Sequence, residues 1–445
     1  MGFEDLYRDS DELAADAEKI ATLANAICAD KFKSFNTLHD TDYGVEFWRI
    51  LLLPWILWVS QAVWVRYRYL SRLVDRHRDQ AFSVDIPSLE LRWPVADTRS
   101  LHRDVLQTPG FNEWLSARVL SKIAPINWQL RQTSETHNAE TAQESEVPVH
   151  KRVARWLRFL ATDQRCRRVY GISGRAWLIS AYLSLIKTKP TSRLTLPARN
   201  ISQVAADFPA TFLEVLSDTL DRTVPKPISS DFENMNLRAA QRRYNRGRIN
   251  LIGPILILNE PEKFILAHAI EQGERIVCTQ HGSSGYQRVN INSVEIENRQ
   301  DAYISWGWQE QGNYPGNIRP LPSPYYQGFR DRASSETEKL LYISTSARVY
   351  GHRLETAFQP LQAMQYPARI VRFFRSLTPS LLEKSAFRPY TGDTGVIDTL
   401  GPVRQSFPSL KIHTGPLSHD ILRVRLNVID HYGTSFGIAM VANAP

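Results

Sequence analysis

A histidine followed by small residues forms the segment with the clearest potential for chemistry. It comes directly after the apolar stretch Arg275–Gln280, which predicts a strand, and it comprises Gln280, His281, Gly282, Ser283, Ser284, Gly285 and Tyr286. His281 could act as a base, an acid or a donor to phosphate, because imidazole changes charge near neutral pH. The two glycines let a backbone approach a ligand, and successive amides there could hold a phosphate or an oxyanion. A turn in which His281 only bonds a backbone carbonyl is the alternative.

Glu260 is the second candidate for acid–base chemistry. It follows the apolar run Pro254–Leu258, which we predict to be a buried strand, so we expect it to face the same crevice as His281. A carboxylate paired with a histidine is suited to general base catalysis. The alternative is that Glu260 begins a helix, where the dipole favours a carboxylate and Pro261 fits the first turn.

Three later segments could hold the phosphates of a nucleotide. Ser344 and Ser346 follow a predicted strand at Lys339–Ser344 and could contact phosphate or cap a helix. Arg388 follows another apolar stretch, and its guanidinium could bind a pyrophosphate or lie on the surface. Thr434 and Ser435 come after Asp430 and start an apolar helix, where hydroxyls and amides suit a diphosphate. Ordinary capping by Thr434 would give the same local pattern.

The elements that must position these residues alternate between strand and helix. Strands at Pro254–Leu258, Arg275–Gln280 and Asp301–Trp306, with a helix at Phe264–Gln272 ended by Gly273 and short connections, predict a parallel sheet. A second alternating block follows, with strands at 339–344, 410–413 and 427–430 and with helices around Leu354–Met364, near Arg375–Glu383, around Ser418–Arg425 and from Thr434. We predict an α/β fold with two Rossmann-like domains after a helical N-terminal region. The boundaries are 1–130 for the helical region, 131–147 for a polar loop, 148–311 for the first Rossmann-like domain, 312–338 for a Pro/Gly-rich linker, and 339–445 for the second. The second domain looks incomplete, because a further strand and closing helices would be expected.

The composition indicates a globular protein with anionic partners. Hydrophobic residues make up 43% of the chain and charged residues 22%, which excludes disordered and fibrous classes. A net charge of +8 favours anionic partners such as nucleotides, phospholipid surfaces or nucleic acid, without choosing among them. The three cysteines have no metal-ligand spacing, and the acidic start of the chain lacks the pattern of a secretion signal, so we expect a reduced, cytoplasmic protein.

One apolar segment, Ile50–Val65, raises the question of a membrane. Its sixteen residues fall short of the ~20 that a spanning helix needs. We therefore predict a buried helix. Peripheral contact with an anionic membrane through the arginines that follow, at the inner face of the plasma membrane, is an alternative, as is a true span.

Several short motifs together resemble a transferase family encoded in O-antigen-type surface-polysaccharide gene clusters. The first motif comprises Asn36, His39, Phe47, Trp48, Arg49, Pro54 and Trp55. The others are Gln280-His281-Gly282 with Gly285 and Tyr286, the run Ser305-Trp306-Gly307-Trp308, and Arg388-Pro389-Tyr390. The resemblance covers nearly the whole chain.

This family is similar to GT-B glycosyltransferases, which implies a donor site in the second domain. Asp430, Thr434, Ser435 and the segment 443–445 fall in register with the GT-B donor motifs, whereas Ile438 stands where a glutamate commonly holds the donor ribose. The resemblance implies no bound metal and no cofactor besides a nucleotide-sugar co-substrate. It also implies a glycan or lipid-linked glycan acceptor, and we expect no nucleic acid partner.

Three classes of function remain open from the sequence. The first is a glycosyltransferase that moves a sugar from a nucleotide-sugar donor to a surface-polysaccharide acceptor. The second is a polyol-phosphate transferase or a sugar-nucleotide epimerase, and the third is a non-catalytic glycan-binding protein. For the first class, we expect the loop of His281 and the helix that starts at Thr434 to belong to opposite lobes and to face each other across a gap.

Overall fold

The computed structural model describes residues 5–133, 169–170, 200–241, 248–282, 289–309, 317–323, 325–329, 339–355, 358, 360–390 and 395–445. The fold is mixed α/β with parallel sheets, as the alternating pattern predicted. The chain divides into two compact units. The smaller unit comprises Met1–Ala17, Gly282–Asn290 and Leu321–Pro445, and the larger comprises Glu18–His281 and Ile291–Pro320.

The N-terminal part of the chain is mainly helical, as predicted. Its elements are α1 (Ser10–His39), α2 (Val45–Arg76), β1 (Phe82–Ile86), α3 (Thr98–Ser100), the π-helix η1 (Leu101–Val105), α4 (Pro109–Ile123) and β2 (Trp128–Gln132). The strands β1 and β2 pair in parallel. Because β2 runs to Gln132, the polar segment predicted at 131–147 starts later than expected, and its remainder from residue 134 lies outside the described residues.

Helix α2 contains the apolar segment predicted to be a buried helix. Among the described residues it is the one helix long and apolar enough to cross a membrane, and 94% of its most apolar window is buried inside the structure. It packs against α4, against α8 (Ala210–Arg222) and against α11 (Glu260–Glu271). Its side chains therefore supply much of the core of the larger unit.

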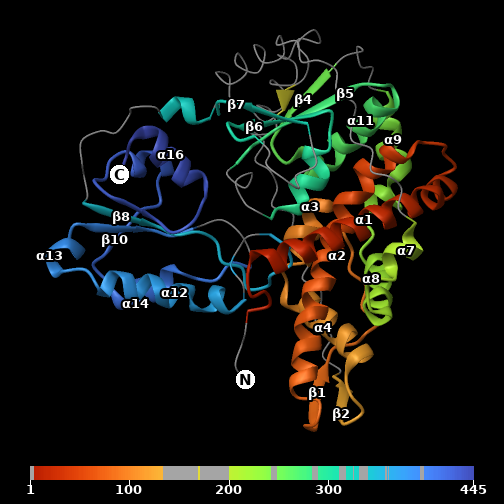
Figure 1. The fold of residues 1–445 in the computed structure, drawn as a ribbon, viewed down its shortest axis with the longest axis horizontal. Coiled ribbons are helices and arrows are strands. Elements are labelled where there is room, and N and C mark those ends of the chain that lie inside the picture. Colours follow the sequence, from red (N-terminus) through yellow and green to blue (C-terminus); the bar gives the residue numbers. More distant parts are fainter. Residues whose placement is uncertain are drawn as a thin grey trace. The chain divides into compact units, whose positions relative to one another are not determined.

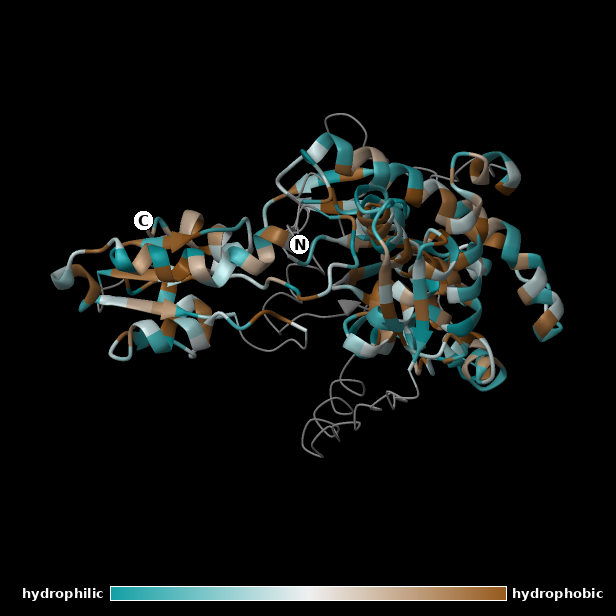
Figure 2. Cartoon of the chain, turned by 90° about the horizontal axis from the view of Figure 1, so that it is seen from below, coloured by the Kyte–Doolittle hydropathy of each residue, from teal (hydrophilic) through white to brown (hydrophobic). Residues whose placement is uncertain are grey.

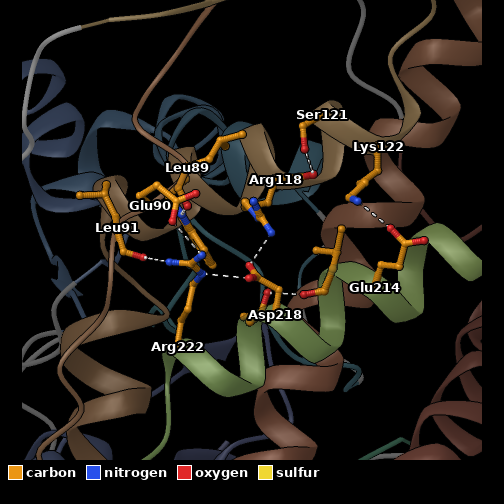
Figure 3. Close-up of polar contacts among 12 residues, drawn as sticks. Leu89, Glu90, Leu91, Arg118, Ser121, Lys122, Glu214, Asp218 and Arg222 are labelled. Atoms are coloured by element: carbon orange, nitrogen blue, oxygen red, sulfur yellow. Dashed lines mark hydrogen bonds and ion pairs between the residues drawn. The ribbon is translucent and has the colours of Figure 1, made fainter.

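Ion pairs join α4 to α8 on the outside of this core (Figure 3). The Asp218 carboxylate lies 2.8 Å from the Arg118 guanidinium and accepts from Arg222 at 3.0 Å, and Lys122 lies 2.6 Å from Glu214. The Arg222 guanidinium also donates to the carbonyl of Leu91 at 3.2 Å. The Arg118–Asp218 and Lys122–Glu214 pairs link the two helices, although partly exposed pairs contribute little stability each.

The larger unit also holds a five-stranded sheet. Its strands, in spatial order, are β3 (Val169–Tyr170), β4 (Arg248–Ile252), β5 (Arg275–Thr279), β6 (Ala302–Trp306) and β7 (Ile318–Leu321). The pairs from β3 to β6 are parallel. The other described elements here are α7 (Ile201–Ala205), the 3-10 helix η2 (Lys226–Ile228), α9 (Phe232–Ala240), α10 (Ile255–Leu258) and the π-helix η4 (Ser293–Asn298). The strands predicted near β5 and β6 are thus confirmed.

The strand predicted at Pro254–Leu258 is wrong. The strand is β4, which ends at Ile252, because Gly253 has a φ of 104° and turns the chain. The apolar run that follows forms the helical turn α10. A short apolar run has no periodicity that separates a buried strand from a buried helical turn. The predicted helix before Gly273 is confirmed as α11.

The smaller unit is built on a four-stranded parallel sheet. Its strands are β8 (Leu340–Ile343), β9 (Ser385–Arg388), β10 (Lys411–Ile412) and β11 (Asn427–Ile429). Its helices are α12 (Pro360–Arg375), α13 (Pro379–Leu382), α14 (Leu400–Ser406), α15 (Leu417–Ile421) and α16 (Thr434–Ala442), and the 3-10 helix η5 (Tyr326–Phe329) packs on α16. Helices α12 and α14 cover one face of the sheet, and α16 covers the other (Figure 1).

The order of these strands is β10-β9-β8-β11. The chain therefore runs outward from β8 to β10 and then returns to the other side of β8. A doubly wound sheet reverses its strand order in this way, and ligands bind such sheets beyond the carboxyl ends of the strands at the reversal. The reversal here lies between β8 and β11.

Burial on both faces explains why these strands form. Leu340, Tyr342, Phe374, Phe387 and Val403 belong to one buried cluster under α12 and α14. The strands of this unit are mostly brown in Figure 2, whereas its helices mix hydrophobic and hydrophilic residues. The predicted strands at 339–344, 410–413 and 427–430 are confirmed, and so is the helix from Thr434.

Two helix predictions in this unit need correction. The helix expected around Leu354–Met364 begins only at Pro360, because Glu355 forms a β-bridge with Asn290 and proline favours the first helical turn. The helix expected near Arg375–Glu383 is the end of α12 followed by the short α13.

Candidate functional site

The loop that carries His281 begins at the carboxyl end of β5 and is held there by Gln280. The Gln280 backbone N–H donates to the carbonyl of Ile304 at 2.9 Å. Its buried side-chain oxygen accepts from the backbone N–H of Trp306 at 2.8 Å and from Nε1 of Trp308 at 2.7 Å. Two motifs of the predicted family are therefore in direct contact. Gln280 fixes the point from which His281 leaves the sheet, and its predicted contact with a ligand stays a prediction.

His281 lies against a buried carboxylate that the sequence did not indicate. Its Nε2 is 3.3 Å from Oε1 of Glu297, which lies on η4. The side chain of His281 is 25% exposed and that of Glu297 is 2% exposed. The imidazole can therefore reach a ligand on one side while a carboxylate holds it on the other.

The carboxylate controls the charge of this histidine. Burial by itself lowers the pKa of His281, but the negative charge of Glu297 and its hydrogen bond outweigh burial and raise the pKa above the usual 6.5. A histidine with a raised pKa is a stronger base toward a hydroxyl proton once it is deprotonated.

Glu260 has other partners than His281. It is the first residue of α11, and Asn259 caps this helix through a hydrogen bond from the N–H of Glu262. The Glu260 carboxylate lies 2.9 Å from Nζ of Lys263 and accepts from the backbone N–H of Thr98 at 3.2 Å. Lys263 also donates to the Thr98 hydroxyl at 2.8 Å. This arrangement matches the alternative of a helix-start carboxylate, and the catalytic assignment of Glu260 stays a prediction.

The remainder of the predicted loop is only partly described. Gly282 is half-buried, while Ser283, Ser284, Gly285 and Tyr286 lie outside the described residues. Their predicted contact with a phosphate or an acceptor therefore stays a prediction.

In the smaller unit, the predicted donor-binding residues gather at the carboxyl edge of the sheet. Ser344 directly follows β8, Arg388 ends β9 and Asp430 directly follows β11. Thr434 and Ser435 begin α16 a few residues later. Parallel strands end at the same edge of a sheet, so the topology brings these residues together as expected.

Ser344 and Arg388 are engaged with the protein at this edge. The Ser344 hydroxyl donates to the carbonyl of Arg388 at 3.3 Å and accepts from the N–H of Tyr390 at 2.9 Å, so it does not cap a helix. The Arg388 guanidinium forms an ion pair with Asp420 on α15, and Asp420 also lies 2.9 Å from Nδ1 of His413. Ser346 is half-buried.

Asp430 is held ionised at the reversal of strand order. The Tyr342 hydroxyl donates to its Oδ2 at 2.7 Å, and Nδ1 of His431 lies 3.1 Å from its Oδ1. Tyr366 also hydrogen-bonds Asp430 and accepts from the N–H of Thr345 at 2.9 Å. Burial by itself raises the pKa of Asp430, but these hydrogen bonds outweigh it and lower the pKa.

The start of α16 is free of side-chain capping. Its N-cap residue is Gly433, and no side chain caps it, so Thr434 is not the cap that the alternative expected. The Ser435 hydroxyl lies 3.3 Å from Nε2 of His431, which continues the contact between His431 and Asp430. A Cβ at Gly433 would lie 2.5 Å from the His431 ring, so only glycine allows this close approach.

Ile438 is fully buried in α16. A side chain at this position faces the core of the unit. Ile438 therefore contributes to packing, and the expectation that this unit binds the ribose of a donor stays a prediction.

The described residues contain no group of three or more histidine, cysteine, aspartate or glutamate side chains that could hold a metal ion. His281 belongs to the larger unit and the helix from Thr434 belongs to the smaller one. The expectation that the two face each other stays a prediction.

Sequence reasoning missed Glu297, Asp420, Tyr342 and Tyr366. Tyr342 lies on a predicted strand and Tyr366 lies just beyond the helix predicted at Leu354–Met364, but nothing in the sequence marks a core tyrosine as a partner of Asp430. Glu297 and Asp420 lie on short helices whose faces cannot be assigned before the sheet order is known.

A family model described as LIC12162 family transferase matches residues 3–445. No curated protein and no solved structure matches the chain.

Proposed function

This chain belongs to the LIC12162 family of transferases, and from that premise we propose that it is a glycosyltransferase. Its donor is a nucleotide sugar, and its acceptor is a glycan or a lipid-linked glycan of a surface polysaccharide of the O-antigen type. The fold we infer for this activity is the GT-B arrangement of two Rossmann-like domains.

The donor nucleotide binds the smaller unit in this proposal. The observation that carries it is the strand order β10-β9-β8-β11, whose reversal lies beside Asp430 and the start of α16. Helix amides and hydroxyls at Thr434 and Ser435 suit the diphosphate. Arg388, Ser344 and Ser346 lie on the neighbouring strand ends or loops, and the Arg388 guanidinium is the cation suited to a phosphate oxygen.

His281 is the general base in this proposal. It is the one predicted acid–base residue whose side chain is partly exposed and partnered by a buried carboxylate. The acceptor hydroxyl gives its proton to His281, and its oxygen forms a bond to the anomeric carbon of the sugar. The bond between that carbon and the diphosphate breaks, and the nucleoside diphosphate leaves with the electron pair. Glu260 supports the fold through Lys263 instead.

A thermal-shift screen of nucleotide sugars tests the donor site. A ligand that binds the folded state raises the melting temperature by mass action. We expect at least one nucleotide sugar to raise it in the wild-type protein and to do so less in a Thr434→Ala/Ser435→Ala double variant. No shift with any nucleotide sugar, or equal shifts in both proteins, would contradict the proposed donor site.

A further inference from the structure

We propose that Glu297 is a positioning residue for His281, which fixes its imidazole so that Nδ1 is the nitrogen that receives the acceptor proton. This inference rests on the proposed function, because it takes His281 as the base. It replaces Glu260 as the partner of that histidine.

The contact geometry selects one nitrogen of the ring. Nε2 of His281 is 3.3 Å from Oε1 of Glu297. An ionised carboxylate only accepts hydrogen bonds, so Nε2 carries the proton in the neutral imidazole. The lone pair is then on Nδ1, on the side of the ring away from Glu297. The same carboxylate stabilises the imidazolium that forms when Nδ1 takes a proton.

Among the described residues, His281 is the ion-pair partner that the Glu297 carboxylate has. Its carboxylate is buried, and within the described part of the chain its Oε2 has no hydrogen-bond partner. A buried carboxylate is costly unless a positive charge or hydrogen bonds compensate for it. His281 can supply that charge whenever it is protonated, which links the two residues through the catalytic proton.

The neighbouring glutamate on the same π-helix shows the contrast. Glu295 accepts from Arg299 at 2.7 Å and 2.8 Å and from Asn25 at 2.8 Å. Its bonds tie η4 to the helical region, which is a structural task. Glu295 and Arg299 neutralise each other, so Glu297 is the charged group on η4 that acts on His281.

The backbone on both sides of the contact is fixed independently of the pair. Gln280, the residue before His281, is held at the end of β6 by its hydrogen bonds with Trp306 and Trp308. Residues of η4 are bonded to the helices of the larger unit, as the Arg49 guanidinium donates to the Glu295 carbonyl at 3.1 Å. Loss of the Glu297 charge should therefore change the imidazole without moving the loop.

The test follows the imidazole directly by NMR with histidine labelled with ¹³C and ¹⁵N. A His281→Gln variant identifies the His281 signals in the wild-type spectrum. We expect the neutral imidazole of His281 to carry its proton on Nε2, and we expect Glu297→Gln to move the titration midpoint of His281 to lower pH. Glu297→Asp should restore part of the shift. Glu295→Gln is the matched control and should leave the midpoint where it is in the wild type.

Kinetics of the same variants separate positioning from folding. Glu297→Gln should lower kcat about 10- to 100-fold and change KM less than about twofold, since it affects a proton transfer and not substrate binding. A proton on Nδ1 in the wild type, or an unchanged midpoint in Glu297→Gln, would overturn the inference whatever the activity. A lowered midpoint together with full turnover in His281→Gln would instead refute the base assignment in the proposed function. The first readout needs no variant of Glu297, so it decides the question even if Glu297→Gln does not fold.

Discussion

Nε2 of His281, in the loop after β5, lies 3.3 Å from Oε1 of Glu297 on η4, and both residues belong to the larger unit. The histidine sits at the carboxyl end of a parallel strand, and the carboxylate is buried behind it. General bases in enzymes are commonly oriented by a third group in this way. Of the two residues that the sequence marked for acid–base catalysis, His281 is therefore the one whose surroundings suit a general base.

Replacement of His281 by alanine should remove the proton acceptor. We expect kcat to fall about 10²- to 10⁴-fold, the range that general acid–base catalysis contributes. Donor affinity, measured by calorimetry, should stay within about twofold. The matched control is His419→Ala, since His419 is an exposed histidine on α15. Near wild-type turnover in His281→Ala would remove this residue from the reaction.

The charge of His281 should also appear in the pH dependence of stability. Its folded-state pKa is raised, so the pair with Glu297 stabilises the protein fully below the unfolded pKa, and this stability is lost as the pH rises through the folded pKa. His281→Gln should therefore be less stable than wild type near pH 5.5, and the difference should shrink toward pH 8.5. Urea unfolding at both pH values measures this. A difference that grows with pH would contradict the sign of the shift.

Arg388 should contribute to donor affinity. Its guanidinium lies at the strand end beside the proposed diphosphate site and is oriented by Asp420. A hydrogen bond to a charged group contributes about 1.5–3 kcal/mol, so Arg388→Ala should weaken donor binding about tenfold or more in calorimetry. Arg404, an exposed arginine on α14, provides the control as Arg404→Ala. Equal affinities for the two variants would place Arg388 outside the donor site.

Removal of the Glu260 carboxylate should cost stability. Lys263 is fully buried and is paired with Glu260 at 2.9 Å, so Glu260→Ala leaves a buried ammonium without its counter-charge. Breaking a buried pair from one side costs about 3–5 kcal/mol. Urea unfolding should show a loss of this order. A stability within about 1 kcal/mol of wild type would show that this pair does not support the fold.

Gly437 on α16 should not tolerate a side chain. An added Cβ would lie 2.1 Å from the ring of Tyr326, which is buried on η5. Gly437→Ala should therefore lower the free energy of unfolding by about 1–3 kcal/mol, the usual cost of overpacking. Gly415→Ala is the control, because an added Cβ there has no atom within 4 Å. Equal stability of the two variants would contradict the close packing of α16 on η5.

The sequence predicted the parts of the fold that have clear local signals. Strands such as Leu340–Ile343 are apolar and bounded by polar residues, and Gly273 marks the end of α11. The sequence failed at Ile255–Leu258, because an apolar run of that length has no period that separates strand from helix. The strand that the sequence placed at Pro254–Leu258 is instead β4, which lies earlier in the chain at Arg248–Ile252.

The candidate site was predictable for residues that end strands and not for their partners. His281 and Asp430 closely follow strands and Arg388 ends one, so the topology of parallel sheets places them at the carboxyl edges. Glu297 and Asp420 depend on how η4 and α15 pack against those edges, which no local pattern records. The pairing of Glu260 with His281 was inferred from a strand that does not exist, so it lost its geometric basis.

The nucleotide product tests the central claim most directly. The protein is incubated with a nucleotide sugar that raises its melting temperature and with surface-polysaccharide glycans, and the products are separated by chromatography and mass spectrometry. We predict release of the nucleoside diphosphate and a glycan heavier by one sugar, with both lost in His281→Ala. Release of a nucleoside monophosphate with a phosphate-bearing glycan, or a changed sugar that stays on its nucleotide, would contradict glycosyl transfer.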